Sequence, residues 1–253
     1  MNFPASSKHH DGMDSYDRVY SNLDDFQKSE EIYGFIDRLT ELVEHDLPCM
    51  RCVSGCSDCC RQQVLAGFDE WRIAHAWILE NLDVEMQQAI VGKAEALLAD
   101  AASAIPVWMR LRGMADTTDE YLRTINDALR NQSTPCPFLE RNRCSIYAAR
   151  PSICRAYGRM MRTEESAYYC DNILVQMESS PVGIDDMELP VFQPYHRAVL
   201  DRGPGQLDEV NVLPVWVLAH RASDGTLRTV THRIDPISPF PVVDGYWSYD
   251  DDE

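Results

Sequence analysis

Residues 52–64 read CVSGCSDCCRQQV, which places four cysteines within nine positions and makes two of them adjacent. A fifth thiol, Cys49, lies three residues upstream. The spacing from Cys56 to Cys59 allows two thiolates in a tight turn to converge on one metal ion. The adjacent pair, Cys59 and Cys60, suits one tetrahedral site less well, because neighbouring side chains usually diverge. The segment therefore predicts metal binding, either by a cluster with several metal atoms or at two separate sites.

A second group of cysteines begins at Cys136 and is spaced more widely. It consists of Cys136, Cys144 and Cys154, with Cys170 beyond them. These gaps are too wide for a local metal knuckle, so we expect the fold to bring the two groups together. Eight of the nine cysteines then suffice for two four-thiolate sites, of either the Zn²⁺ or the iron–sulfur type. Cys49 is then the spare, or it replaces Cys52.

Arginines are concentrated around this second group. The stretch 141–162, RNRCSIYAARPSICRAYGRMMR, has six arginines and no acidic residue in a chain with a net charge of −18. Guanidinium groups stabilise thiolates and donate hydrogen bonds to sulfur. Of the nearest arginines, which include Arg143, we predict that Arg150 and Arg155 contact the bound cofactor or an anionic substrate. The alternative is that these arginines pair with carboxylates of the acidic protein.

Composition and charge limit the class of protein. The chain has 253 residues, of which 45% are hydrophobic and 25% charged, as in an ordinary soluble globular protein. No apolar segment is long enough to span a bilayer, and the N-terminus lacks the pattern of a secretory signal. We therefore expect a cytoplasmic protein, whose reduced thiols bind metal rather than form disulfides. The net charge argues against nucleic acid and against a membrane as partners, because an acidic surface repels phosphate.

Apolar residues at helical spacing predict four helices before residue 130. Their apolar faces carry, in chain order, Ile32, Ile36, Leu39 and Val43; Trp71, Ala74, Ile78 and Leu82; Met86, Ile90, Leu97 and Ala101; and Tyr121, Ile125 and Leu129. Pro48 ends the first helix, and Asp83 is placed to cap the third. Thr117 and Glu120 fit a capping box for the fourth.

The C-terminal part of the chain has a different pattern. Residues 212–234, VLPVWVLAHRASDGTLRTVTHRI, predict two strands around the turn Asp224–Gly225. The predicted fold is therefore mainly α (α+β): a helical body around a metal-bound cysteine core, with a small antiparallel β extension at the C-terminus. We expect a flexible N-terminus over 1–20, a helical cysteine-cluster domain over 21–180, and a β-containing extension over 181–253 packed on the same domain.

The two cysteine segments also resemble a known family. Residues 52–60 are similar to the CxxCxxCC motif of the zinc- or iron-chelating, YkgJ-type cysteine-cluster proteins, and 136–158, CPFLERNRCSIYAARPSICRAYG, is similar to their CPFL…C.IY..RP..CR element. By position, the resemblance implies these metal ligands: Cys52, Cys56, Cys59, Cys60, Cys136, Cys144, Cys154 and, at a less fixed distance, Cys170. The first gap has three residues where the family pattern has two, so Cys49 competes with Cys52.

The resemblance covers roughly residues 49–170 and leads to several functional hypotheses. We expect an iron–sulfur or iron-binding protein with one or two clusters, acting in electron transfer or in cluster-dependent modification of an unidentified protein or small molecule. Similar cysteine motifs occur in flagellin lysine methylases, so an enzyme would be a metal-dependent oxidoreductase or a transferase of that type. The alternatives are a Zn²⁺-stabilised interaction module without catalytic activity, and metal storage or delivery.

Overall fold

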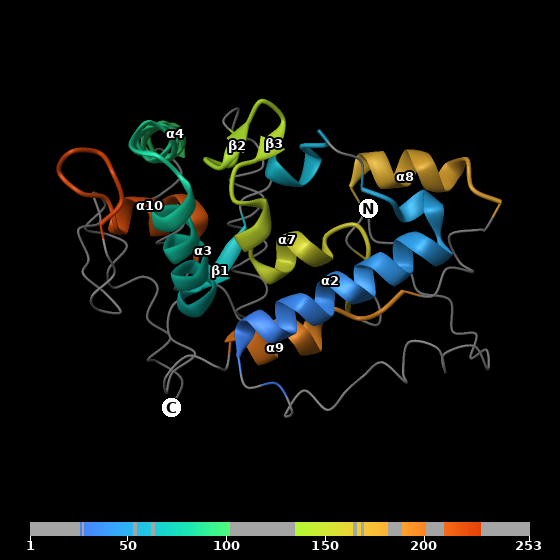
Figure 1. The fold of residues 1–253 in the computed structure, drawn as a ribbon. Coiled ribbons are helices and arrows are strands. Elements are labelled where there is room, and N and C mark those ends of the chain that lie inside the picture. The colour runs from blue at the N-terminus through green and yellow to red at the C-terminus, as the bar shows by residue number, and fades with distance from the viewer. Residues whose placement is uncertain are drawn as a thin grey trace, which may run out of the picture. The chain divides into compact units, whose positions relative to one another are not determined.

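The computed structural model describes residues 26, 28–52, 55–61, 64–101, 135–163, 166–167, 170–181, 189–200 and 210–228 (Figure 1). The chain divides into two compact units, each made of two stretches of sequence. Unit 1 comprises Met1–Cys59 and Pro151–Gly205, and unit 2 comprises Cys60–Arg150 and Gln206–Glu253. The division falls between the adjacent cysteines, so each unit has cysteines of its own.

Unit 1 is built on helix α2 (Ser29–Asp46). The apolar face predicted for this helix is confirmed, because the four residues that define it are buried: Ile32, Ile36, Leu39 and Val43. At the start, the backbone N–H of Lys28 donates to the carboxylate of Glu31 at 3.2 Å. The helix ends just before Pro48, which opens the 3₁₀-helix η2 (Pro48–Met50), because proline cannot continue the backbone hydrogen bonding.

The described part of unit 1 contains three further α-helices. Helices α7 (Ser152–Ala156) and α9 (Gln193–Leu200) pack against α2, while α8 (Asp171–Glu178) packs against η2 (Figure 1). A short antiparallel ribbon, β4 (Met161–Thr163) with β5 (Ser166–Ala167), links α7 to α8. The backbone of Met161 also bonds to that of Pro190 and Phe192, both at 2.8 Å, which attaches the segment that leads into α9.

Unit 2 contains the second and third predicted helices. They are α3 (Phe68–Asn81) and α4 (Val84–Ala101), and the predicted apolar residues Trp71, Ala74 and Ile78 are fully buried. Asp83 caps α4 as predicted, since its carboxylate accepts the backbone N–H of Met86 at 2.8 Å. The helix predicted around Thr117 and Glu120 lies outside the described residues, as does the predicted flexible stretch 1–20.

The C-terminal prediction is partly wrong. Residues predicted to form the first strand of a hairpin form helix α10 (Leu213–Ala219), which packs against α4. Pro214 is well placed in the first helical turn, and three apolar residues at helical spacing are buried: Leu213, Trp216 and Val217. The predicted turn is present, because the backbone N–H of Ala222 donates to Thr226 at 2.7 Å and Arg221 bridges to Leu227. The second predicted strand, from residue 229, lies outside the described residues.

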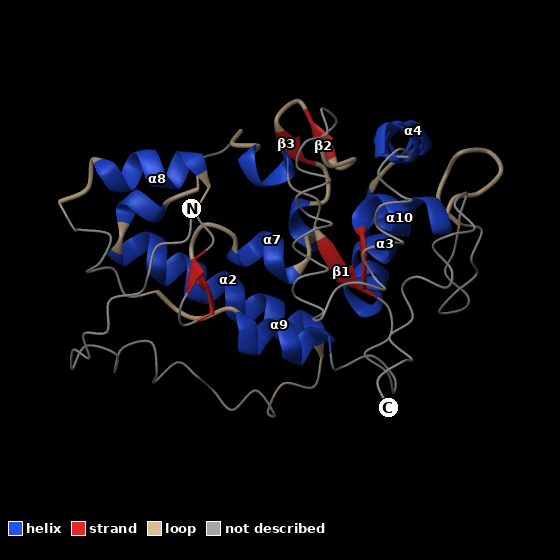
Figure 2. Cartoon of the chain, turned by 180° about the vertical axis from the view of Figure 1, so that it is seen from behind, coloured by secondary structure: helices blue, strands red, loops and turns tan. Residues whose placement is uncertain are grey.

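The strands of unit 2 form two more short antiparallel ribbons. Strand β1 (Leu65–Gly67) pairs with β6 (Val210–Val212), and β2 (Leu139–Glu140) pairs with β3 (Arg143–Cys144). The mainly helical class with small antiparallel sheets is thus confirmed (Figure 2). The three-part division of the chain stays a prediction, although residues 181–253 contribute α9 to unit 1 and α10 to unit 2.

The described part of the chain contains no helix that is both long and apolar enough to cross a membrane.

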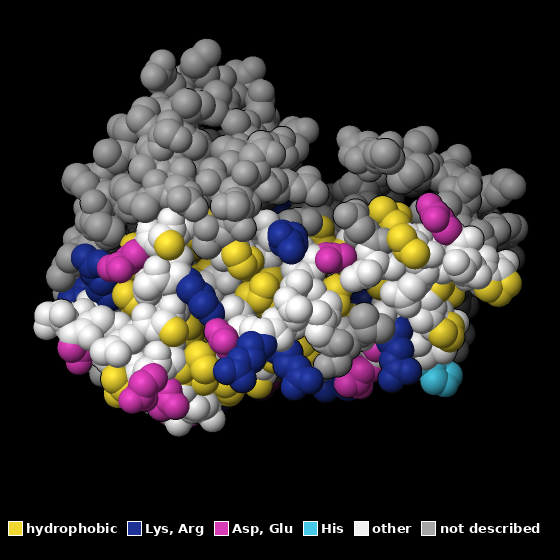
Figure 3. All heavy atoms as spheres, turned by 90° about the horizontal axis from the view of Figure 1, so that it is seen from above, with side chains coloured by type: hydrophobic (Ala, Val, Ile, Leu, Met, Phe, Trp, Pro, Cys, Tyr) yellow, Lys and Arg dark blue, Asp and Glu magenta, His cyan; other side chains and the backbone are white. Residues whose placement is uncertain are grey.

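On the face drawn in Figure 3, acidic and basic side chains are interspersed among apolar ones over the described atoms. The acidic residues of the C-terminal stretch 248–253 lie outside the described residues. On this face, the described residues form no large patch of a single sign of charge.

Candidate metal centre

In unit 1, cysteines gather around the first turn of α8. Cys170 is the N-cap residue of this helix, with an extended backbone. Two residues later, the side-chain amide of Asn172 donates a hydrogen bond to Cys56 Sγ at 3.0 Å. The backbone N–H of Asn172 donates to Asp58 Oδ2 at 3.3 Å. The first turn of α8 thus holds the segment 56–58 beside Cys170.

The electrostatics of Cys170 show which groups surround it. Burial raises the pKa of the Cys170 thiol, and the negative charges of Cys56, Asp58 and Cys52 raise it further. The backbone N–H of Ile173 acts in the opposite direction. Thiolates that repel one another in this way are stabilised when a cation binds between them. Thiolate sulfur is a preferred ligand of zinc and of iron–sulfur clusters, so the chemistry of Cys52, Cys56 and Cys170 fits such a group, although their side chains are not assembled into a site in this structure.

The turn that follows α7 packs against the same cysteine. Gly158 has a φ of +81°, and a Cβ at this position would lie 3.3 Å from Ile173 Cγ1 and 3.8 Å from Cys170 Sγ. Only glycine meets both the backbone and the space requirement here. Cys154, on α7, belongs to the same unit. Unit 1 therefore draws on both cysteine segments of the sequence.

Cys49 occupies a different environment from Cys52. It packs against an apolar cluster that also receives Cys170 and whose buried members are Val43, Met50, Ile173 and Met177. Cys52 is instead exposed on the following loop, within electrostatic range of Cys170. Cys170, a predicted ligand, packs against the same cluster as Cys49, so the choice between Cys52 and Cys49 stays a prediction.

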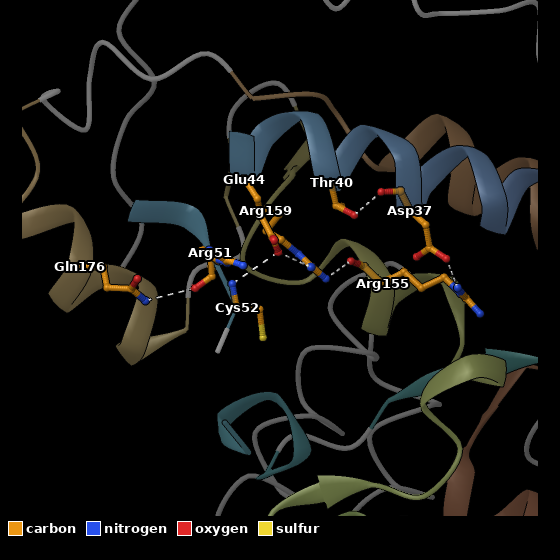
Figure 4. Close-up of polar contacts among 8 residues, drawn as sticks. All are labelled: Asp37, Thr40, Glu44, Arg51, Cys52, Arg155, Arg159 and Gln176. Atoms are coloured by element: carbon orange, nitrogen blue, oxygen red, sulfur yellow. Dashed lines mark hydrogen bonds and ion pairs between the residues drawn. The ribbon is translucent and has the colours of Figure 1, made fainter. Parts of the chain in front are cut away.

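A polar network fixes the backbone around Cys52 (Figure 4). Glu44 on α2 accepts the backbone N–H of Cys52 at 3.4 Å and the guanidinium of Arg159 at 2.8 Å. The Arg159 side chain is only 6% exposed and also donates to the carbonyl of Arg155. From α8, Gln176 donates to the carbonyl of Arg51 at 3.4 Å. The loop is thus tied to both α2 and α8.

The arginines predicted to bind a cofactor have protein partners. Arg155 pairs with Asp37 on α2, and its guanidinium carbon lies 4.7 Å from the centroid of the Tyr33 ring. Arg150, in unit 2, lies over the Tyr147 ring at 3.9 Å. Pairing with carboxylates, the alternative raised from the sequence, is what the structure shows for Arg155. Cofactor binding by Arg150 and Arg155 stays a prediction.

In unit 2, the remaining cysteines lie on a hydrogen-bonded scaffold. The backbone N–H of Cys136 donates to the carbonyl of Cys60 at 2.7 Å. Cys136 leads into the β2–β3 ribbon, where Cys144 pairs with Leu139. The ribbon turns through Arg141 and Asn142, whose φ values of +47° and +60° are typical of a two-residue hairpin turn. The three cysteines Cys60, Cys136 and Cys144 are therefore brought into one local arrangement.

Helix α4 anchors this ribbon through one lysine. The ammonium of Lys93 donates to the carbonyl of Leu139 at 2.8 Å and to the carboxylate of Glu140 at 2.7 Å. The hydrogen bond from Lys93 lowers the pKa of Glu140. Since Leu139 faces Cys144 across the ribbon, Lys93 holds the backbone opposite a predicted ligand.

Comparison with known families supports the chemistry of these cysteines. Residues 49–171 match the CxxCxxCC family model, described as a "putative zinc- or iron-chelating domain". Residues 49–171, just under half of the chain, are thus assigned to a CxxCxxCC domain. The family resemblance is thus confirmed, and all eight predicted ligands fall within the matched residues. Comparison with curated proteins and with solved structures gives no significant match.

The predicted ligands do not form a complete metal site among the described residues. Among the residues that the structure describes, no three His, Cys, Asp or Glu side chains lie close enough to hold a metal ion. Cys59 lies at the end of unit 1, in the 3₁₀-helix η3 (Asp58–Arg61). In other cysteine-rich metal domains the ligands come together only when the metal binds. The identity of each ligand stays a prediction.

Three residues that contact the cysteine segments could not be predicted from the sequence. They are Glu44, Lys93 and Asn172, and each donates to or accepts from a cysteine segment. Asn172 lies only two positions after Cys170, and this proximity is the one sequence signal that could have indicated its role. Lys93 lies on α4, 46 positions before Leu139, whereas Glu44 lies at the end of α2, only eight positions before Cys52. Only the tertiary structure identifies these two.

Proposed function

We propose that the CxxCxxCC domain binds iron as one or two iron–sulfur clusters, using thiolates grouped separately in each unit. The observation that carries the proposal is the first turn of α8, where the N-cap residue is Cys170 and the side-chain amide of Asn172 donates to Cys56 Sγ at 3.0 Å. Cys59 and Cys154 belong to the same unit and are the candidates for a fourth ligand there. In unit 2, the corresponding thiols are Cys60, Cys136 and Cys144.

Iron is favoured over zinc by the number and placement of the thiols. Unit 1 contains six cysteines, more than a mononuclear zinc site needs: Cys49, Cys52, Cys56, Cys59, Cys154 and Cys170. The adjacent pair falls on either side of the division between the units. Cys59 and Cys60 can therefore serve separate groups, which answers the steric objection to their sharing one tetrahedral site.

The proposed activity is electron transfer, or cluster-dependent modification of a protein or small molecule. A bound iron–sulfur cluster supplies one-electron chemistry. The chain's own contribution is to hold the thiolates and to donate hydrogen bonds to sulfur, as Asn172 does to Cys56. We place this activity in the cytoplasm, where thiols stay reduced.

A second candidate is a structural Zn²⁺ site, and the exposure of the first cysteine loop favours it. Arg51, Cys52 and Gly55 are exposed, and the described contacts of this loop are mainly polar. A zinc ion would fix such a loop outright. The protein would then be a zinc-stabilised interaction module without catalytic activity.

Metal analysis separates the two candidates. The protein is purified without oxygen, and its iron, zinc and acid-labile sulfide are measured together with the visible spectrum. We expect iron with matching sulfide and a brown colour, and a partial loss of iron in each of the variants Cys56→Ser and Cys60→Ser. The control variant Cys49→Ser keeps its iron. A colourless sample that contains only zinc would contradict the iron proposal and support the zinc module.

A further inference from the structure

We infer that Asn172 is a positioning residue of the metal centre, which sets the electronic properties of the metal through its hydrogen bond to the Cys56 sulfur. The inference rests on the proposed role of Cys56 as a ligand. It is carried by geometry that the cysteine motif itself does not contain, since the family pattern specifies the thiols and not their hydrogen-bond donors.

The contact between Asn172 and Cys56 is direct. The side-chain nitrogen lies 3.0 Å from Cys56 Sγ, well within hydrogen-bonding distance for a sulfur acceptor. An amide N–H that points at a thiolate withdraws negative charge from the sulfur. Hydrogen bonds of this kind set the reduction potential of iron–sulfur clusters and the affinity of thiolate sites for metal.

The backbone of Asn172 adds a second contact to the same segment. Its N–H donates to Asp58 Oδ2 at 3.3 Å, so one residue binds both Cys56 and the carboxylate two positions later. Two contacts from one residue, one from its backbone and one from its side chain, favour the orientation in which the amide faces Cys56 Sγ.

Gln176 offers a matched control on the same helix. Its amide lies one turn after Asn172 and donates to two backbone carbonyls, those of Arg51 at 3.4 Å and Asn172 at 3.3 Å. It therefore helps to hold the cysteine loop, and neither of these bonds reaches a sulfur. If α8 only clamps the loop, removal of either amide should have similar consequences. If Asn172 acts on the sulfur, only its removal should change the metal.

Substitutions of Asn172 distinguish the loss of its hydrogen-bond donor from the loss of helix α8. Asn172→Ala removes the donor without adding charge. Asn172→Asp replaces it with a carboxylate that repels the thiolate, while an acidic residue in the first turn favours the helix. A loss of metal binding in Asn172→Asp therefore cannot be attributed to loss of α8.

The experiment reconstitutes the full-length protein with Fe²⁺ and sulfide without oxygen, and measures iron content and midpoint potential. The variants are Asn172→Ala, Asn172→Asp, Gln176→Ala and Cys56→Ser. We expect about tenfold weaker iron retention against a chelator in Asn172→Ala, the magnitude typical of an outer-shell partner. We also expect a midpoint potential more negative than that of the wild type in both Asn172 variants, with the larger shift in Asn172→Asp. The potential of Gln176→Ala should be unchanged. If the protein takes up zinc instead, the same variants are titrated with Co²⁺, and the sulfur-to-cobalt absorption band replaces the potential.

The outcomes distinguish two failures. If Cys56→Ser binds metal like the wild type, Cys56 is not a ligand and the proposed centre in unit 1 is wrong. If Cys56→Ser loses metal while both Asn172 variants keep the wild-type potential or absorption band, the inference about Asn172 alone is overturned. Equal changes in Asn172→Ala and Gln176→Ala would also overturn it, since they would show a clamp without action on sulfur.

Discussion

The cysteines of the two units are held in different ways. In unit 1 the loop around Cys52 and Cys56 is fixed by side chains, chiefly Glu44 and Asn172. In unit 2 the peptide groups of Cys60 and Cys136 bond to each other, and a β-ribbon fixes Cys144. Backbone bonding orders a scaffold without its metal, whereas side-chain contacts to an exposed loop leave more of the order to the metal. The comparison predicts that metal loss affects unit 1 more than unit 2.

The largest expected effect is that of metal removal. Loss of a thiolate-bound structural metal costs on the order of 10 kcal/mol in small metal domains. We expect a chelator to abolish hydrogen-exchange protection in residues 49–59 and in α8, while α3 and α4 keep theirs. Hydrogen exchange followed by mass spectrometry, with and without the chelator, makes this measurement. Equal losses in the two units would remove the distinction between them.

The next prediction compares two ion pairs of α2. Glu44 pairs with Arg159, and Asp37 pairs with Arg155. Because both guanidiniums are buried, Glu44→Gln and Asp37→Asn should each cost about 3–5 kcal/mol in unfolding free energy. Only Glu44 also accepts the N–H of Cys52, so only Glu44→Gln should weaken metal binding beyond its cost in stability. Chemical denaturation and chelator competition on both variants test this, and parallel losses of metal would contradict it.

Acid should destabilise unit 2 through His75. Burial, reinforced by the nearby His220, lowers the pKa of His75 from 6.5 to about 4, against an opposing backbone contact from Arg228. Between pH 6.5 and 4, His75 is therefore protonated in the unfolded chain but neutral in the native state. The free energy of unfolding falls as the pH drops through this range. At 1.36 kcal/mol per pKa unit, the loss is about 3 kcal/mol.

Denaturation curves across this pH range, followed by tryptophan fluorescence, measure that loss. The variant His75→Phe keeps an aromatic ring beside Trp71, whose centroid lies 5.4 Å from that of His75, but it cannot titrate. Its stability should change less with pH than that of the wild type. An identical pH dependence in the two proteins would show that His75 is not responsible.

The smallest expected effect is on stability, and it compares one glycine of each unit. Gly158→Ala in unit 1 should cost about 1–2 kcal/mol for the left-handed backbone, and more from the contact with Ile173. Gly92→Ala, on an exposed position of α4 with open space around it, should instead stabilise unit 2 by roughly 0.5–1 kcal/mol. Thermal denaturation of both variants tests whether Gly158→Ala lowers the stability and Gly92→Ala raises it. A stabilised Gly158→Ala would show that the turn after α7 is not constrained as described.

The helices that could be predicted from the sequence are those whose signal is local. The apolar spacing of α2, α3 and α4 and the cap at Asp83 depend on neighbouring residues alone, and all four predictions are confirmed. Helix α10 was missed because its short apolar run also fits a buried strand. Its burial against α4, which decides between the two, is a tertiary property.

The candidate site shows the same limit. The cysteine motifs identified the family, because their spacing can be read directly from the sequence. They did not reveal which thiols share a unit, because that depends on how distant segments fold together. The arginines illustrate the point: proximity in sequence placed Arg155 near Cys154, yet its guanidinium reaches Asp37 on α2. Charges find partners by tertiary position, and sequence distance is a poor guide to them.

The distribution of tryptophan offers a practical advantage. Trp71 and Trp216 stack in the core of unit 2, with centroids 6.4 Å apart, and Trp71 Nε1 donates to His220 at 3.0 Å. All five tryptophans of the chain fall within the residue ranges of unit 2. Their emission is therefore an intrinsic optical reporter for that unit alone. The visible absorption of the proposed iron–sulfur clusters would supply a second signal. Unfolding of unit 2 and loss of the clusters could then be followed separately in one sample, without labels.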